Sequence, residues 1–238
     1  MKESWTAALL LIVGLAAILA LWLWVLRPPP RPPEEIRAAR GSLKLVVCFG
    51  DSLTAHGGLG GRYSDFLARA LPGVEIVNRG ISGDTLEGGR RRFDRETLAL
   101  APDVVIVELG ANDFVRMQRP LSELREDLEY LLAAARKNGA QVIVAGVLGK
   151  TKPGYRDELG TQFTDEQKAF GAEILEMERE VCAQYGAAHI DNIQDDLTLP
   201  EHWADKRHPN AAGNELVAKL ILPYLKDALG VQHAKAQP

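Results

Sequence analysis

Strand-like and helix-like segments alternate along most of this chain, and that alternation restricts the fold more than any other feature. The strand-like segments are short apolar runs rich in Val, Ile and Leu, which is typical of strands buried on both faces of a parallel sheet. The alternation predicts right-handed crossovers with helices on both faces of the sheet, an α/β domain of three layers. The expected strands are 43–49, 74–78, 103–109, 141–147 and 187–190, and the expected helices are 63–71, 85–98, 121–137, 165–185 and 211–229.

The composition is that of a globular protein, with 46% hydrophobic and 25% charged residues among 238. A formal net charge of -4 gives no electrostatic basis for binding nucleic acid. The basic cluster Arg90-Arg91-Arg92 lies in an expected helix, and we interpret it as a solvent-exposed face. Cys48 and Cys182 are too few for a disulfide framework and are interpreted as core residues. Zinc-site spacing is absent from the sequence, so we expect neither a metal nor a cofactor.

An uncharged apolar segment, Trp5–Leu26, is long enough to cross a bilayer as a helix. Trp5 near one end and Trp22 and Trp24 near the other suit the two membrane interfaces. One alternative is a cleaved signal peptide, but Arg27 and a proline run follow the segment instead of a small-residue cleavage site. The other alternative is a buried core helix, but the segment has no polar face. We therefore expect an uncleaved membrane anchor.

The charges around the anchor give conflicting predictions of its orientation. Lys2 precedes it and four arginines follow it by residue 40, so the positive-inside rule places the following domain in the cytoplasm. A signal-anchor that leaves its short tail inside predicts the reverse, a domain on the periplasmic side of the inner (cytoplasmic) membrane, and we adopt this second orientation as the expectation. The prolines after the anchor favour an extended spacer. The expected organisation is a tail and anchor at 1–26, a Pro-rich spacer at 27–41, a domain at 42–230 and a C-terminal tail at 231–238.

Residues suited to catalysis follow three of the expected strands. Ser52 comes just after the first strand, and ligands of open α/β sheets bind outside the carboxyl ends of the strands. The glycines of 80–85, after the second strand, permit backbone N–H groups to approach a developing negative charge. Asn112, after the third strand, offers a neutral amide donor for an oxyanion. Each of these residues also has an ordinary interpretation as part of a turn or a helix cap, as Asp51 and Asp84 do.

A serine nucleophile needs a base of near-neutral pKa and a carboxylate that orients this base. Asp205 and His208 are three residues apart in the loop before the last helix and can supply both groups. The remaining histidines are weaker candidates because each lies too close to Ser52, within a strand, or without an upstream Asp: His56, His189, His202 and His233.

Together these motifs resemble the conserved blocks of the SGNH (GDSL) hydrolases, in the same order. The chain is most similar to the bacterial thioesterase, lysophospholipase and arylesterase branch, and the resemblance spans Leu43 to Leu229. The four blocks are Gly50-Asp51-Ser52-Leu53, Gly80-Ile81-Ser82-Gly83-Asp84-Thr85, Gly110-Ala111-Asn112-Asp113 and Asp205-x-x-His208-Pro209-Asn210.

The resemblance implies a flavodoxin-like fold with strand order 2-1-3-4-5. It also implies roles for the residues of the blocks: Ser52 would be the nucleophile, His208 the general base and then acid, and Asp205 its orienting partner.

The oxyanion hole implied by the resemblance consists of the backbone N–H groups of Ser52 and Gly83 and the side chain of Asn112, with Gly80 as a second candidate for the glycine. Residues 114–119 occupy the position of the substrate-binding loop of the family. The candidates for substrate contact in this loop are Phe114, Val115 and Arg116, and an ordinary surface loop is the alternative.

We therefore expect a membrane-anchored serine hydrolase that cleaves esters or thioesters of small or lipid-like acyl groups through an acyl-enzyme. A carbohydrate O-acetylesterase is the alternative within the same chemistry, and a non-catalytic binding module is the alternative from another class. A nucleotide or flavin binder is disfavoured because the Gly-x-Gly-x-x-Gly fingerprint and the P-loop lysine are absent after the first strand. The expected partners are the small-molecule substrate and, through residues 5–26, the membrane, with no nucleic acid.

Overall fold

The computed structural model describes residues 12–16, 19, 31–58, 60–149 and 163–231. It divides into two units, Met1–Pro32 and Pro33–Pro238. In the first unit, residues 12–16 and 19 are helical and carry exposed apolar side chains. Within the described ranges, no helix has both the length and the apolar character needed to span a bilayer. The rest of the anchor expected at 5–26 lies outside the described residues.

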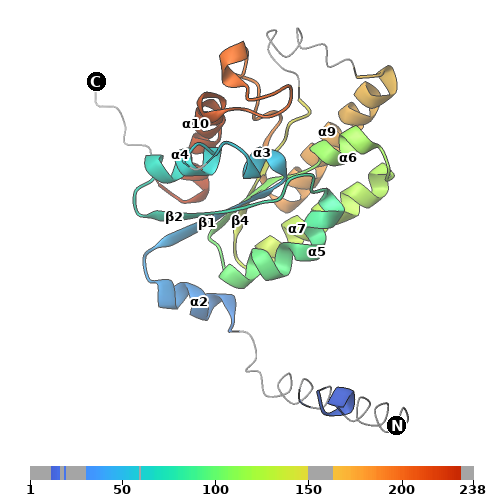
Figure 1. Ribbon diagram of the computed structural model, residues 1–238. Coiled ribbons are helices and arrows are strands. Elements are labelled where there is room, and N and C mark those ends of the chain that lie inside the picture. Colours follow the sequence, from blue (N-terminus) through green and yellow to red (C-terminus); the bar gives the residue numbers. More distant parts are fainter. Residues whose placement is uncertain (1–11, 17–18, 20–30, 59, 150–162, 232–238) are drawn as a thin grey trace, which may run out of the picture. The chain divides into compact units, whose positions relative to one another are not determined.

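The second unit is built on a five-stranded parallel sheet whose order is β2-β1-β3-β4-β5 (Figure 1), as the resemblance implies. β1 lies between β2 and β3, and its last residue, Gly50, is opposite Gly80 of β2 and Glu108 of β3. The carboxyl ends of these three strands therefore form one edge, where the motifs converge. The strands are β1 (Lys44–Gly50), β2 (Val74–Gly80), β3 (Val104–Glu108), β4 (Gln141–Ala145) and β5 (Ala188–Ile190).

Helices cover both faces of the sheet and bury one apolar cluster on each. Successive residues of β1 alternate between the clusters: Val46 and Cys48 belong to one, Val47 and Phe49 to the other, which explains its continuous apolar sequence. α4 (Tyr63–Ala70) and α10 (Ala211–Ala228) pack on one face, and α5 (Leu86–Glu96), α7 (Leu121–Lys137) and α9 (Asp165–Tyr185) pack on the other.

The three-layer fold and its long elements agree with the prediction, and the differences are short helices that the sequence analysis did not anticipate. α2 (Pro33–Arg40) lies within the stretch assigned to the spacer. Pro33 stands at its first position, where the missing N–H costs no hydrogen bond. Arg37 donates to Pro102 O at 2.7 Å and Arg40 to Ala101 O at 2.8 Å, so side-chain contacts hold α2 against the domain. The other short helices are α3 (Ser52–Ala55), α6 (Ala111–Arg116), and the 3₁₀ turns η1 (Leu98–Leu100) and η2 (Pro200–His202).

The solvent-exposed interpretation of the arginine cluster is wrong for Arg92, which is only 6% exposed. Its guanidinium donates to Asp84 Oδ2 at 2.7 Å and to Gly50 O at 3.0 Å, and it lies 4.0 Å from the centre of the Phe49 ring. Arg91, the next residue, is exposed as expected. One acceptor of Arg92 ends β1 and another lies in the loop between β2 and α5, so only the tertiary structure reveals why Arg92 is buried.

Candidate active site

Ser52 lies at the carboxyl edge of the central strand, as the first residue of α3. The preceding residue, Asp51, caps this helix: its Oδ1 accepts the Leu53 N–H at 2.9 Å. The expectation that Asp51 is a cap residue is therefore confirmed. A short helix that starts directly after a buried strand fixes the serine where β1 leaves the sheet.

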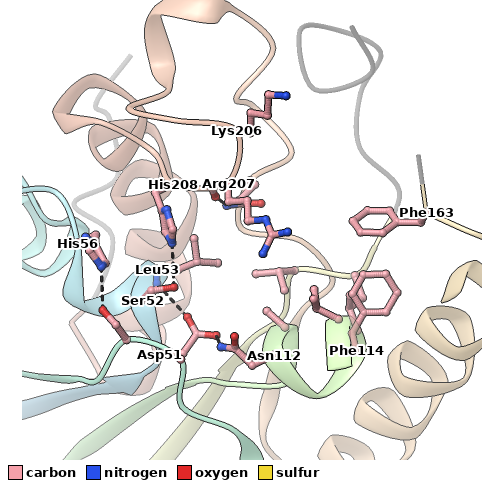
Figure 2. A pocket seen from close by; sticks show the side chains of 17 residues that line it. Asp51, Ser52, Leu53, His56, Asn112, Phe114, Phe163, Lys206, Arg207 and His208 are labelled. Carbon is pink, nitrogen blue, oxygen red and sulfur yellow. Dashed lines mark hydrogen bonds between the residues drawn. The ribbon is translucent and has the colours of Figure 1, made fainter. Parts of the chain in front are cut away.

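His208 reaches Ser52 from the loop before α10 (Figure 2), and Asp205, three residues earlier in this loop, contacts the His208 ring. His208 Nε2 is 3.0 Å from Ser52 Oγ, and His208 Nδ1 is 2.8 Å from Asp205 Oδ2. A carboxylate at Nδ1 favours the tautomer whose proton is on Nδ1, which leaves Nε2 free to accept the serine proton. The structure thus brings together the three residues that the sequence singled out, across 156 positions of the chain.

Asp205 also organises its own loop. Its Oδ1 accepts the backbone N–H groups of Arg207 at 2.7 Å and His208 at 2.9 Å. Burial alone would raise the pKa of Asp205, but the hydrogen bonds from His208 and these two N–H groups lower it to about 2. The carboxylate is therefore ionised at neutral pH, as a partner of an imidazolium must be.

Two backbone N–H groups near Ser52 are positioned as donors. The N–H of Ser52 is the first of α3, so it has no acceptor within that helix. Gly83 lines the cavity in front of Ser52, with a φ of +79° that favours glycine, and its N–H donates to no acceptor among the described residues. Gly80, the second candidate, already donates its N–H to Asn78 Oδ1 at 3.0 Å and does not line the cavity. The geometry therefore favours Gly83.

The side-chain amide of Asn112 lies beside Ser52 in the wall of the same cavity. Its Nδ2 donates to Asp51 Oδ2 at 2.8 Å and to Asp84 O at 2.9 Å. Both amide hydrogens therefore have acceptors in the protein, and a substrate oxygen would share one of them. The two bonds fix the orientation of the amide before any substrate arrives.

Asp51 and Glu108 form a buried carboxyl pair behind this edge, and the sequence predicted no role for Glu108. Burial raises the pKa of Asp51 to about 6, and burial together with the charge of Asp51 raises that of Glu108 well above its usual range. Glu108 Oε2 accepts the Thr54 hydroxyl at 2.9 Å and the Asp51 N–H at 3.3 Å. The available signal was a glutamate that ends an otherwise apolar buried strand.

A cavity of about 290 Å³ opens in front of Ser52, with one apolar side and one polar side. On the apolar side the rings of Phe114 and Phe163 pack edge to face, with their centroids 4.8 Å apart. Of the three substrate-contact candidates, Phe114 and Val115 line the cavity, whereas Arg116 is not among the lining residues and donates to the O atom of Gly83, which is, at 2.8 Å. The lining residues are Asp51, Ser52, Leu53, His56, Ser82, Gly83, Ala111, Asn112, Phe114, Val115, Val147, Leu148, Phe163, Gln194, Lys206, Arg207 and His208.

His56 belongs to the cavity wall, although the sequence analysis set it aside as the base. Its ring lies against that of His208, with centroids 4.9 Å apart, and its Nε2 is 2.8 Å from Ser82 Oγ. The His56 ring therefore borders the base, and its backbone N–H donates to Ser52 O at 2.8 Å, while no hydrogen bond joins its side chain to Ser52 among the described residues.

The sequence model of the GDSL-like Lipase/Acylhydrolase family matches residues 48–216. Esterase TesA of Pseudomonas aeruginosa is 28% identical over 154 residues, which cover 65% of this chain and 71% of the relative. An arylesterase of Vibrio mimicus is 26% identical over 77% of this chain and 88% of the relative. An acetylxylan esterase of Geobacillus stearothermophilus is 25% identical over 76% of this chain and 94% of the relative. A crystal structure of TesA superposes with a TM-score of 0.65 at 25% identity, covering 78% of this chain and 99% of that chain.

The family match spans well over half of the chain and includes all four motifs. Their key residues all lie within it: Ser52, Gly83, Asn112 and His208. The chain therefore belongs to the GDSL-like lipase/acylhydrolase family and is an ester-cleaving serine hydrolase of the SGNH type.

Proposed function

We propose that this serine hydrolase cleaves esters or thioesters of small or lipid-like acyl groups, with Ser52 as its nucleophile. The observation that carries the proposal is the unbroken line of hydrogen bonds from Ser52 Oγ through His208 to Asp205, at the wall of a cavity with an apolar side. The proposal assigns the oxyanion hole to the N–H groups of Ser52 and Gly83 and the amide of Asn112.

In the first half of the reaction, Ser52 Oγ attacks the carbonyl carbon while His208 Nε2 takes the hydroxyl proton. The carbonyl oxygen becomes an oxyanion, and the three donors stabilise its charge. The bond from carbon to the leaving oxygen or sulfur then breaks, and Nε2–H gives its proton to the leaving atom. An acyl ester on Ser52 and a free alcohol or thiol remain.

In the second half, water takes the place of the leaving group. His208 Nε2 accepts a proton from this water as its oxygen attacks the acyl carbon. The bond between carbon and Ser52 Oγ breaks, and Nε2–H returns the proton to Oγ. The carboxylic acid leaves, and each step uses only residues that line the cavity or bond to one that does.

The acyl group occupies the side of the cavity formed by Phe114, Val115 and Phe163 in this proposal, because burial of apolar surface there favours an alkyl chain. A volume of about 290 Å³ suits a short or single chain. The alternative, an O-acetylesterase of carbohydrate, is supported by the relatedness to an acetylxylan esterase. p-Nitrophenyl esters of increasing chain length test the choice: activity confined to acetyl esters and acetylated glycans would contradict the lipid-like substrate.

The decisive experiment for the nucleophile is labelling of the full chain with a fluorophosphonate probe. We expect Ser52→Ala to abolish labelling and His208→Ala to reduce it steeply. Ser82→Ala and His56→Ala are matched controls, because both side chains line the same cavity without touching Ser52, and each should still label. Labelling that persists in Ser52→Ala, or a folded wild-type protein that does not label, would contradict the activated serine.

We also propose that residues 5–26 anchor the enzyme to the inner membrane, with the catalytic domain on the extracytoplasmic side. The exposed apolar side chains of Ile12, Val13, Leu15 and Leu19 support the anchor, since such surfaces suit lipid. Protease added to intact spheroplasts should digest the domain of the full chain. Protection until the membrane is broken would place the domain in the cytoplasm and overturn the orientation.

A further inference from the structure

We propose that Arg207, assisted by Lys206, forms a subsite for a negatively charged group on the leaving-group side of the ester. The class of substrate is an ester whose alcohol carries a phosphate or a carboxylate. This inference rests on the proposed function and adds to it a preference for the part of the substrate that departs first.

The side chains of Lys206 and Arg207 both line the cavity. Figure 2 shows Arg207 directed into the space between His208 and Phe163. Among the described residues, neither the Arg207 guanidinium nor the Lys206 ammonium group forms an ion pair or a side-chain hydrogen bond. Arginines elsewhere in the fold behave differently: Arg62, for example, is paired with Asp65 at 2.8 Å. Arg207 therefore presents an unused bidentate donor to whatever occupies the cavity.

Two carboxylates of the described part of the site, Asp205 and Asp51, are already engaged by other donors. Asp205 accepts hydrogen bonds from the His208 ring and from two backbone N–H groups. Asp51, the carboxylate in the cavity wall, is directed to the Leu53 N–H and the Asn112 amide. The positive charge at the polar side of the cavity is therefore left for a ligand.

The chemistry of the reaction places the leaving group on this side. His208 Nε2 must give a proton to the leaving atom, so that atom lies within hydrogen-bond reach of Nε2, about 3 Å away. The oxyanion points instead towards Asn112 and Gly83, and the acyl chain takes the apolar side. Arg207 is the residue directly before His208, so its side chain borders the region that the leaving group must occupy.

The loop that carries Arg207 is held by its own hydrogen bonds. Asp205 Oδ1 accepts the Arg207 N–H at 2.7 Å, so the same carboxylate fixes the backbone of both the base and the cation. A cation that starts from a fixed backbone position loses less freedom when it binds an anion than one on a mobile segment would. The turn at Asp205 thus fixes the position of Arg207 relative to His208.

Two matched substrate pairs test the subsite with the full chain. 1-Butyrylglycerol and 1-butyrylglycerol 3-phosphate share an acyl group and differ by a phosphate. 4-Nitrophenyl butyrate and 3-carboxy-4-nitrophenyl butyrate differ by a carboxylate. The measured quantity is the ratio of kcat/KM for the anionic ester to kcat/KM for its neutral counterpart at one pH. Any effect of a substitution on the protonation of His208 acts on both members of a pair and cancels in the ratio.

We expect Arg207→Gln to lower this ratio about tenfold for at least one pair, with less than a twofold change for the neutral esters. Lys206→Gln should lower the ratio two- to threefold, and Arg207→Lys should retain part of it. Lys137→Gln is the matched control for net charge: it removes one cation near the amino end of β4, away from the cavity, and should leave the ratio unchanged. In the wild type, the ratio should fall as salt is raised from 20 to 500 mM.

The two pairs distinguish the ligand: an effect on the glycerol pair alone identifies phosphate as the group recognised, and an effect on the nitrophenyl pair alone identifies carboxylate. Unchanged ratios for both pairs in Arg207→Gln, with neutral esters still hydrolysed, would overturn the subsite and leave the proposed function standing. Failure of the proposed function has a separate signature, namely a folded wild type that hydrolyses neither neutral ester and does not react with fluorophosphonate, and it would overturn the subsite as well.

Discussion

The side-chain amide of Asn112 donates a hydrogen bond of 2.8 Å to Oδ2 of Asp51, the residue directly before the proposed nucleophile. The same Asp51 carboxylate caps the helix that begins with Ser52. One carboxylate therefore sets the position of both the serine and the proposed side-chain donor of the oxyanion hole. The alignment of two motifs 60 residues apart in the sequence thus depends on a residue that takes no part in the proton transfers.

Removal of the Asn112 amide should slow catalysis without weakening substrate binding. We expect Asn112→Ala to reduce kcat by about 10²–10³-fold, because the oxyanion is present in the transition state and not in the bound ester. KM for a neutral ester should change little. Ser82→Ala, in the same cavity, is the control and should keep kcat within a fewfold of wild type. A loss that appears mainly in KM would contradict the role in the oxyanion hole.

Asp51→Asn tests whether the carboxylate positions Asn112. An asparagine at 51 can accept only one of the two bonds, from Leu53 N–H or from Asn112, and it turns an N–H towards the other donor. We expect kcat to fall about tenfold with KM preserved. Asp94→Asn, which changes an exposed partner of Tyr130, is the control for the same chemical change. Unaltered kcat in Asp51→Asn would remove Asp51 from the positioning of the amide.

Arg92 should contribute far more to stability than its neighbour Arg91. Arg92→Met leaves the largely buried Asp84 carboxylate and the Gly50 carbonyl without their donor, which should reduce the free energy of unfolding by about 3 kcal/mol. Arg91→Met removes an exposed pair with Glu87 and should cost no more than about 0.5 kcal/mol. Urea unfolding of the two variants makes the comparison, and equal losses would show that the burial of Arg92 is energetically unimportant.

The stability contributed by Asp205 should depend on pH. Its folded pKa of about 2 lies below its ordinary value of 3.8, so the ionised form is favoured by folding. The contribution is therefore complete above pH 3.8 and disappears as the pH falls towards 2. We expect the difference in Tm between wild type and Asp205→Asn to be smaller at pH 3 than at pH 7. A difference that does not change between these pH values would contradict the ionised, hydrogen-bonded carboxylate.

Local sequence patterns predicted the strands and long helices because each element carries its own signal. α7 and α9 begin and end at the expected residues, and Thr164 and Gly186 cap α9 as capping preferences require. Short helices lack enough residues for a periodic pattern, so α3 and α6 were not predicted. α2 depends on contacts of its arginines with carbonyl groups near residue 101, which no local pattern encodes.

The candidate catalytic residues could be recognised in the sequence because their types and order carry chemical meaning. The buried residues that hold them in place could not be recognised. Ser52, His208 and Asn112 each follow a strand or precede a helix in a polar motif. Glu108 and Arg92 support the site from buried positions, and burial is a property of the folded chain. In most proteins a glutamate at a strand end or an arginine in a helix is exposed, so the sequence alone did not single out these two residues. Arg116 is absent from the cavity lining for a similar reason, because a tertiary contact holds its side chain: the guanidinium donates to the backbone carbonyl of Gly83.

The attachment of α2 determines the edge of the sheet at which the chain enters the domain. α2 is bonded through Arg37 to Pro102 O, just before β3, and so docks at the amino edge of the sheet, whereas Ser52 lies beyond the carboxyl edge. The seven residues of β1 separate the two edges by roughly 20 Å. Pro33, where the chain enters the domain, and the cavity that contains Ser52 therefore lie at opposite edges of the sheet, so the end of the domain that receives the chain is separate from the end that admits substrate.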